Sequence, residues 1–195
     1  DMIAIIDYGA GNLRSVEKAL TAIGEESIVT RDRHEILNAD KVILPGVGAF
    51  GDAMNSLKKY ELDKVIHEVC DMDKPFLGIC LGLQLLFEGS DESQGVEGLH
   101  VLDGQILRLP DKEGLKIPHI GWNSLDLQNN GRLFKGLSEH PYVYFVHSYY
   151  LKAADEAIVT ATTEYSTHIH ASVEKQCVRL PVPSGKEQHS RTFDT

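Results

Sequence analysis

The sequence is poor in cysteine, in positive charge and in long apolar runs, and each shortage excludes a class of function. Three cysteines, at positions 70, 80 and 177, are too few and too unevenly spaced for a disulfide framework or a zinc site, so we expect a reducing compartment and no metal or other cofactor. The 19 Lys and Arg residues are scattered and outnumbered by 29 Asp and Glu, for a formal net charge of -10, so nucleic acid is not an expected partner. No apolar run reaches the roughly 20 residues of a membrane span, so no membrane partner is expected either.

What remains fits one domain. A chain of 195 residues is large enough to bury a core without disulfides or metals, and we predict a single domain over residues 1–195. Residues 1–7 are typical of a first strand rather than of a signal peptide. We therefore expect a cytoplasmic protein.

Short apolar strands alternate with helices in the first half of the chain. Strands are predicted at residues 3–6, 26–30, 41–44 and just before Cys80, with helices at about 13–23 and 49–69. Strands that are apolar on both faces and alternate with helices indicate a parallel sheet covered on both sides. After about residue 99 the apolar runs become short, as expected for antiparallel or mixed strands. The predicted class is α/β, with a mostly parallel sheet flanked by helices and antiparallel strands added in the C-terminal half.

Residues 78–82, Gly-Ile-Cys-Leu-Gly, are the most informative stretch. An apolar run ends there and turns helical, which is typical of a nucleophile elbow: the glycines leave room for a strained backbone, and the following helix directs its first N–H groups toward the sulfur. Because only the thiolate attacks, a nucleophilic Cys80 needs such a setting. A buried structural cysteine in a parallel-sheet protein fits the spacing equally well, so the interpretation depends on the neighbours of Cys80.

Two neighbours support a site at the carboxyl edge of the sheet, where ligands bind in this class of fold. Residues 45–51, Pro-Gly-Val-Gly-Ala-Phe-Gly, follow a strand and free the backbone to form an oxyanion hole, although such a loop alone is more often a turn. One donor of that kind is typically worth about 10²- to 10³-fold in rate. Gln84 lies one helical turn after Cys80 on the same helix face, where its amide either recognises a polar substrate or meets solvent.

Other features are ambiguous. Residues 147–149, His-Ser-Tyr, end the aromatic strand at 142–146 and offer hydrogen-bonding groups, although a histidine there is more often structural than catalytic. Trp122 is the single tryptophan and is either a surface anchor or a core plug. The Gly-Ala-Gly at residues 9–11 is a weak dinucleotide signal, because Arg14 stands where the third glycine belongs.

Five segments, taken in chain order, resemble one family. They are residues 7–13 (Asp-Tyr-Gly-Ala-Gly-Asn-Leu), 44–50 (Leu-Pro-Gly-Val-Gly-Ala-Phe), 77–84 (Leu-Gly-Ile-Cys-Leu-Gly-Leu-Gln), 118–123 (Pro-His-Ile-Gly-Trp-Asn) and 145–149 (Phe-Val-His-Ser-Tyr). The family is the glutamine amidotransferase subunit of imidazole glycerol phosphate synthase, a class I (triad) amidotransferase with a flavodoxin-like fold, and the resemblance runs from residue 2 to about 175. It implies a cysteine-dependent glutaminase of histidine biosynthesis that hydrolyses glutamine to glutamate and passes ammonia to a (β/α)8-barrel cyclase partner.

The resemblance also implies a role for each matching residue. Cys80 is the nucleophile that becomes acylated, and the backbone of Gly46, Val47 and Gly48 forms the oxyanion strand. Glutamine is held by three further residues and the partner is met by three more. The substrate-binding residues are Gln84, Ser148 and Tyr149, and the partner-facing residues are Asn12, Trp122 and Tyr144.

The family pattern stops after about Lys175. Its third signature, a strand followed by Gln-Phe-His-Pro-Glu-Lys, carries the histidine that is the base for the cysteine and the glutamate that orients this histidine. The chain does not contain that signature, and residues 177–188 show neither strand alternation nor a His-x-Glu motif. His189 has Arg191 rather than an acid two residues on. We expect residues 177–195 to be an aberrant tail.

A shifted reading frame explains the departure. With suitable synonymous codons, the bases that encode residues 177–189 spell Ala-Phe-Gly-Cys-Gln-Phe-His-Pro-Glu-Lys-Ser-Ser when they are read one position later. The missing histidine then falls at Pro183 and the missing glutamate at Gly185. The hypothesis is a frameshift near Gln176, and it predicts a chain that is severely impaired as a glutaminase and poorly covered at its C-terminal edge.

Two other classes of function remain open at this stage. One is a cysteine hydrolase with the same elbow and a different base, such as a dienelactone-hydrolase-like or thiol-peptidase-like enzyme. The other is a non-catalytic scaffold that binds glutamine or the barrel subunit without turnover.

Overall fold

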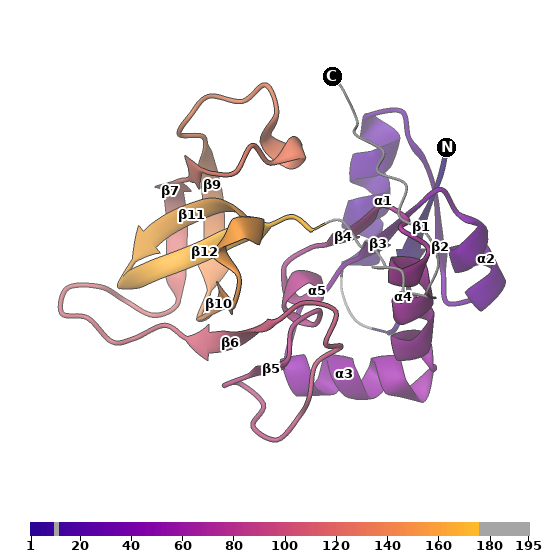
Figure 1. Ribbon diagram of the computed structural model, residues 1–195, viewed down its shortest axis with the longest axis horizontal. Helices are drawn as coiled ribbons and strands as arrows, with labels where there is room; N and C mark the ends of the chain where they lie inside the picture. Colours follow the sequence, from indigo (N-terminus) through magenta and orange to yellow (C-terminus); the bar gives the residue numbers. More distant parts are fainter. Residues whose placement is uncertain (10–11, 176–195) are drawn as a thin grey trace, which may run out of the picture.

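The computed structural model describes residues 1–9 and 12–175, which are organised around two main sheets (Figure 1). The first is a four-stranded parallel sheet of order β2-β1-β3-β4, made of β1 (Met2–Ile6), β2 (Glu26–Thr30), β3 (Lys41–Leu44) and β4 (Phe76–Gly78). In this sheet Ile5 pairs with Val29 on one side and with Ile43 on the other, and Ile43 pairs with Leu77. The predicted parallel strands are thus confirmed.

One face of the parallel sheet is covered by three helices, α2 (Arg33–Asn38), α3 (Phe50–Lys59) and α4 (Leu62–Asp71). The other helices of the first half are α1 (Leu13–Ala22) and the short α5 (Leu81–Gln84). Alternate strand residues such as Ile6 and Leu44 pack with Phe50, Leu57 and Ile66 of α3 and α4 in one buried cluster. Among the described residues, no helix is long and apolar enough to cross a membrane.

The prediction of one helix over about 49–69 was wrong, because the chain breaks it into α3 and α4. Glu61, between them, has φ 55 in the left-handed region. A left-handed residue cannot continue a right-handed helix, so the hydrogen-bond ladder restarts at Leu62. The break lets α3 and α4 run in different directions over the same sheet face (Figure 1).

The opposite face of the parallel sheet, on the side of α1, is less well covered (Figure 1). The sequence predicted a parallel sheet covered on both sides, yet no residue of α1 is buried, and Ile23 just after the helix is 73% exposed. Exposure also rises across this face, from 0% at Ile5 to 6% at Ile43 and 40% at Leu77. Among the described strands β4 pairs only with β3, so Leu77 lies at an edge that no described strand or helix covers.

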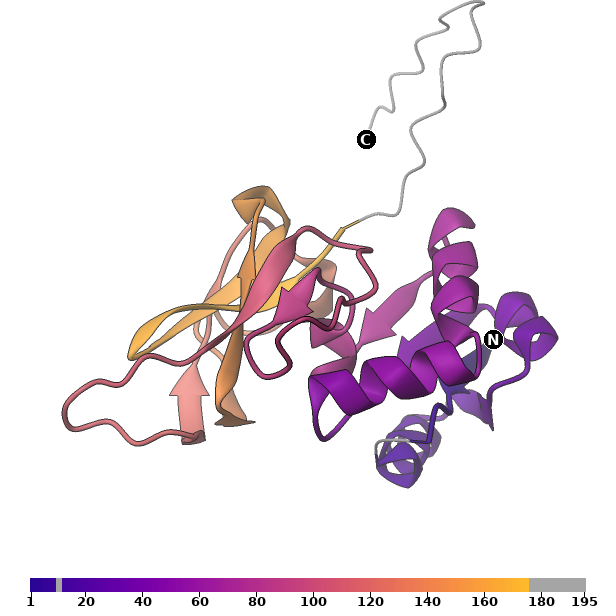
Figure 2. The same ribbon diagram turned by 90° about the horizontal axis from the view of Figure 1, so that it is seen from below.

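The second half forms a six-stranded mixed sheet and a separate two-stranded ribbon (Figure 2). The six-stranded sheet has the order β5-β6-β10-β12-β11-β8, and the antiparallel ribbon pairs β7 with β9. This arrangement confirms the antiparallel strands predicted for the C-terminal half. The strands are β5 (Gly89–Ser90), β6 (Gly104–Arg108), β7 (His119–Ser124), β8 (Asp126–Leu127), β9 (Tyr142–His147), β10 (Tyr149–Ala153), β11 (Val159–Tyr165) and β12 (Thr167–Val173), with 3-10 turns η1 (Arg132–Phe134) and η2 (Glu156–Ile158).

The uneven cover of the parallel sheet predicts uneven costs of truncation. Ile43→Ala removes a nearly buried side chain and should lower the free energy of unfolding by about 2 to 5 kcal/mol, whereas Leu77→Ala, at a partly solvated edge, should cost about 1 kcal/mol or less. Urea unfolding of the two variants measures the difference. Equal costs would mean that Leu77 is covered after all.

Candidate active site

Cys80 stands at the corner between β4 and α5, as the sequence predicted. Its backbone has φ 54 and ψ -119 and its side chain is exposed. A non-glycine residue in this region is strained, and such strain persists only where the surrounding structure holds it in place. The corner therefore presents one thiol to solvent at the carboxyl edge of the parallel sheet.

Close backbone contacts hold the corner. A side chain at Gly82 would place its Cβ 1.9 Å from the carbonyl oxygen of Leu44, and one at Gly78 would place it 2.8 Å from Cα of Leu83. The amide of Gly82 donates to the carbonyl of Ile79 at 2.9 Å. The two flanking glycines are thus required by packing: α5 begins in direct contact with the end of β3.

The loop after β3 meets the corner from the other side. A Cβ on Gly46 would lie 2.9 Å from Cβ of Leu81 and 2.6 Å from the hydroxyl oxygen of Tyr8. That hydroxyl donates to the carbonyl of Pro45 at 2.7 Å, and burial raises the pKa of Tyr8 to about 12, so the phenol remains a donor at any ordinary pH. Tyr8 was not singled out in the sequence, and its position two residues after the predicted first strand was the available signal.

The predicted oxyanion strand lies beside Cys80. Gly48 has φ 99, and no acceptor among the described residues takes the amide N–H of Val47 or Gly48. The amide of Leu81, the first of α5, instead donates to the carbonyl of Gly46 at 3.3 Å. The donors left for an oxyanion are therefore those of the loop, whereas the expectation that the first N–H groups of the helix face the sulfur does not hold for Leu81 in this conformation.

Two residues that the sequence reading missed anchor α3 directly after this loop. The N-cap of α3 is Ala49, whose side chain cannot accept a hydrogen bond. A carboxylate oxygen of Glu92 accepts from the amide of Phe50 at 3.3 Å, and Oγ of Ser93 accepts from the amide of Gly51 at 2.9 Å. An alanine at an N-cap was the available signal that acceptors must come from elsewhere.

The three predicted glutamine-binding residues lie on two different parts of the fold. Gln84 is half-buried at the end of α5, and its backbone N–H donates to the carbonyl of Cys80 at 3.3 Å. Ser148 joins β9 to β10, and its carbonyl accepts from Leu109 at 2.9 Å. Tyr149 begins β10 and packs against the main core. Their joint role in binding a substrate remains a prediction.

Trp122 and Tyr144 are brought together, and Asn12 is not with them. The two rings meet edge to face with centroids 5.6 Å apart and are 71% and 56% exposed. Trp122 lies in strand β7 rather than in a turn, and its exposure excludes the core plug. Asn12 instead caps α1, where its Oδ1 accepts from the amide of Ser15 at 3.3 Å.

The rest of one ribbon face is apolar as well. Successive side chains of a strand point to opposite sides, so alternate residues of the paired strands β7 and β9 share one side. We call the apolar side the outer face of the ribbon. Its members are Ile120, Trp122, Tyr142, Tyr144 and Val146, all more than half exposed. Contiguous exposed apolar surface of this kind marks a binding surface.

No histidine in the described part of the chain, residues 1–9 and 12–175, is hydrogen-bonded to Cys80. The expected position of the base, at Pro183, and the residues expected to form an aberrant tail, 177–195, lie outside the described residues, and so do His189 and Cys177.

Comparison with known sequences gives a consistent picture. The profile of the class-I glutamine amidotransferases matches residues 4–179. The chain is 53% identical to the imidazole glycerol phosphate synthase subunit HisH of Bacillus cereus (strain G9842) over 174 residues, which is 89% of this chain and 82% of the relative. It is 49% identical over 189 residues to the subunit of the same name in Caldanaerobacter subterraneus subsp. tengcongensis, covering 95% and 92% of the two chains.

Solved structures resemble the fold at low sequence identity. A crystal structure of a glutamine amidotransferase aligns with a TM-score of 0.63 at 16% identity, over 85% of this chain and 86% of the other. The structure of PurLQS from Thermotoga maritima aligns with a TM-score of 0.60 at 20% identity, over 83% and 74%. These likenesses confirm the α/β architecture.

The close approach at the corner predicts a sharp difference between two glycines. Gly82→Ala should lower the free energy of unfolding by about 3 kcal/mol, because the added methyl group must displace backbone. Gly89→Ala is the matched control, since its nearest neighbour is the flexible side-chain oxygen of Gln105 at 3.4 Å. Urea midpoints measure the loss of stability, and the alkylation rate of Cys80 measures any change in how the corner presents the thiol. A Gly82→Ala variant with unchanged stability and an unchanged alkylation rate would refute the close contact between Gly82 and the carbonyl of Leu44.

Proposed function

The chain belongs to the class-I glutamine amidotransferases and, among them, to the HisH subunits of imidazole glycerol phosphate synthase, and we propose that Cys80 is its glutamine-attacking nucleophile. The observation that carries the proposal is the strained, exposed Cys80 beside a loop with free amide donors. In the proposed reaction Sγ attacks the side-chain carboxamide carbon of glutamine. The C–N bond then breaks, the nitrogen leaves as ammonia after taking up a proton, and water cleaves the thioester to give glutamate and the free thiol.

The roles of the neighbouring residues are part of this proposal. The backbone of Gly46, Val47 and Gly48 stabilises the oxyanion, and glutamine is held by the three residues predicted for it, Gln84, Ser148 and Tyr149. No cofactor takes part. The free N–H groups of the loop support the oxyanion role, because donors that are already in place stabilise developing charge without reorganisation.

We further propose that the chain delivers ammonia to the cyclase subunit of the synthase, a (β/α)8 barrel, through the outer face of the ribbon. Trp122 and Tyr144 form the centre of this face, and exposed, adjoining aromatic side chains are frequent anchors at protein interfaces. Asn12 is assigned to the same interface from the resemblance alone. A cytoplasmic location is also proposed, because it fits both the low cysteine content and a role in amino-acid biosynthesis.

The chain is proposed to be one domain whose catalytic machinery is incomplete. The main core includes residues of both sheets, such as Ala4 of β1, Ile106 of β6 and Leu151 of β10, which supports a single folding unit. Residues 177–195 are proposed to be an out-of-frame tail that lacks the histidine and glutamate of the triad. Without them Cys80 has no group to take its proton or to protonate the leaving nitrogen.

Restoring the reading frame should restore activity. Deleting one base near the codon of Gln176, so that residues 177–188 read in the alternative frame, should raise the glutaminase rate in the partner complex by about 10²- to 10⁴-fold, the usual worth of general acid–base catalysis. Glutamate release measures the rate. The exposed edge at Leu77 should become covered at the same time, so Leu77→Ala should cost more in the repaired chain than in this one.

The matched control is Cys80→Ser in the repaired chain, which should abolish glutamate release. Activity of the present chain equal to that of the repaired one would contradict the missing-base proposal. Coding DNA that is in frame through the tail by independent reads, with codons that do not spell the signature, would contradict the frameshift itself.

The partner face makes a separate prediction. Trp122→Ala should weaken binding to the cyclase subunit by about 2 kcal/mol, or roughly thirtyfold, because large aromatic side chains at the centre of an interface dominate its affinity. Leu133→Ala is the control, since Leu133 is also exposed, at 61%, but lies on η1 away from the ribbon. Titration calorimetry compares the two variants, and equal effects would exclude the outer face as the docking surface.

Two alternatives are separated by labelling and by co-purification. A glutamine-analogue diazo-ketone should label Cys80, and glutamine should protect it, whereas a cysteine hydrolase of another specificity would show no such protection. A non-catalytic scaffold would bind the cyclase subunit and remain inactive even after the reading frame is repaired.

A further inference from the structure

Two histidines face each other on the side of the ribbon opposite its outer face. His119 of β7 and His147 of β9 are paired in register, and Nδ1 of His119 lies 2.9 Å from Nε2 of His147. His119 is only 3% exposed. Its ring lies nearly parallel to that of Phe145, with centroids 4.8 Å apart, and to that of Tyr165 at the end of β11, with centroids 3.8 Å apart.

The hydrogen-bond partners fix which nitrogen carries each proton. Nδ1 of His147 lies 2.9 Å from the carbonyl oxygen of Tyr149, and because a carbonyl can only accept, this nitrogen must be the donor. In a neutral ring Nε2 of His147 is then an acceptor, so the proton between the two rings belongs to Nδ1 of His119. Burial lowers the pKa of both His119 and His147, which keeps both rings neutral near pH 7.

The result is a directed chain of two hydrogen bonds. It runs from His119 to His147 and from His147 to the backbone of Tyr149, and it crosses from the ribbon to the first residue of β10. The ribbon carries the proposed partner face, whereas Ser148 and Tyr149 are proposed to hold glutamine. Nothing in the proposed chemistry uses either imidazole.

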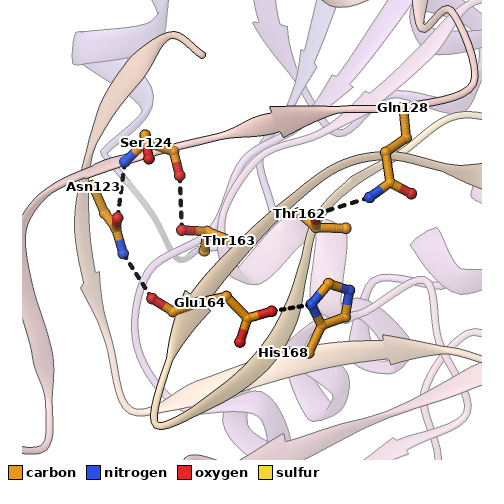
Figure 3. A network of polar contacts seen from close by, with 7 residues as sticks. All are labelled: Asn123, Ser124, Gln128, Thr162, Thr163, Glu164 and His168. Carbon is orange, nitrogen blue, oxygen red and sulfur yellow. Dashed lines mark hydrogen bonds and ion pairs between the residues drawn. The ribbon is translucent and has the colours of Figure 1, made fainter. Parts of the chain in front are cut away.

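The ribbon itself is fixed to the six-stranded sheet by other contacts (Figure 3). Nδ2 of Asn123 donates to the carbonyl of Glu164 at 3.0 Å, and Oγ1 of Thr163 donates to the carbonyl of Ser124 at 2.8 Å. These contacts attach the ribbon near the Ser124 end of β7. The histidine pair is at the other end of the same strand, next to the turn at Ser148, so the two sets of contacts hold different ends of the ribbon.

We propose that His119 is a positioning residue, which acts through His147 to set the segment at Ser148 and Tyr149 in place for glutamine. This inference rests on the proposed function for the identity of the ligand, and on the contacts of His119 and His147 for the positioning. It assigns a role to a buried and a half-buried histidine and distinguishes them from a catalytic base, because the hydrogen bonds of His119 and His147 go to each other and to Tyr149 rather than to Cys80.

Substitutions at His119 separate the hydrogen bond from the ring packing. His119→Phe keeps a flat ring between Phe145 and Tyr165 and removes the donor. His119→Asn places an amide nitrogen where Nδ1 stands and keeps the donor. His67→Phe, on an exposed position of α4, is the control for replacing a histidine by phenylalanine.

Hydrogen exchange at the amide of Leu109, which donates to the carbonyl of Ser148, tests the positioning without any ligand. His119→Phe should accelerate exchange at this amide by about tenfold, the effect expected when roughly one hydrogen bond of support is lost. His119→Asn and His67→Phe should leave it within about threefold of the parent chain. Unchanged exchange in His119→Phe would overturn the inference, and so would equal acceleration in His119→Asn.

Glutamine protection of Cys80 against iodoacetamide tests the consequence for the ligand. In His119→Phe the half-protecting glutamine concentration should rise about tenfold, while the alkylation rate without glutamine stays unchanged and His119→Asn restores the parent value. A purely structural role would lower the urea midpoint without this selective effect, and that result would overturn the inference. If glutamine fails to protect the parent chain, the proposed substrate is wrong, whereas the exchange measurement still decides the positioning role.

Discussion

The carbonyl of Leu44 and the α-carbon of Gly82 approach so closely that no side chain fits between them, and the geometry of the corner depends on this contact. It forces α5 to begin directly against the end of β3, which leaves the residue before it no room for an ordinary backbone conformation. Cys80 therefore adopts a positive φ and turns its sulfur outward. Glycine at position 82 is thus needed for its small size, and we attribute the strain at Cys80 to the close contact between Gly82 and Leu44.

The same contact ties the corner to the core. Gly46, which follows Leu44 by two residues, packs on Leu81, and the buried hydroxyl of Tyr8 fixes the carbonyl of Pro45 between them. These groups lie just after β1, just after β3 and in α5, so two strand ends and one helix together set the position of one thiol. A site built on rigid elements in this way keeps its shape without the tail. Its reactivity depends on a base, which the proposed function places in the tail.

Much of this could be predicted from the sequence, for reasons that are local. The parallel strands follow from apolar runs separated by helical periodicity, and the corner follows from the glycine spacing around Cys80. The break at Glu61 could not be predicted, because a left-handed glutamate has no sequence signal as strong as glycine. The poor cover of α1 and Leu77 also could not be read from local patterns, since a helix with an apolar face looks the same whether or not its partner exists. The pairing of His119 with His147 depends on the register between two strands, and the two residues are 28 positions apart in the sequence. No local pattern contains such a register.

The ribbon explains how binding and chemistry are separable in this chain. Its outer face is apolar and exposed, and its opposite face carries the histidine pair, while hydrogen bonds from Asn123 and Thr163 fix it to the six-stranded sheet. All of these groups precede Lys175, so an altered tail does not remove them. The proposed place of the triad base, in contrast, is in the part of the chain after Lys175. Under the proposed function, a subunit altered only there would keep the surfaces proposed to bind a partner and a substrate and would lose the proton transfer at the thiol. Affinity depends on contacts that are already formed, whereas turnover depends on one further group beside Cys80.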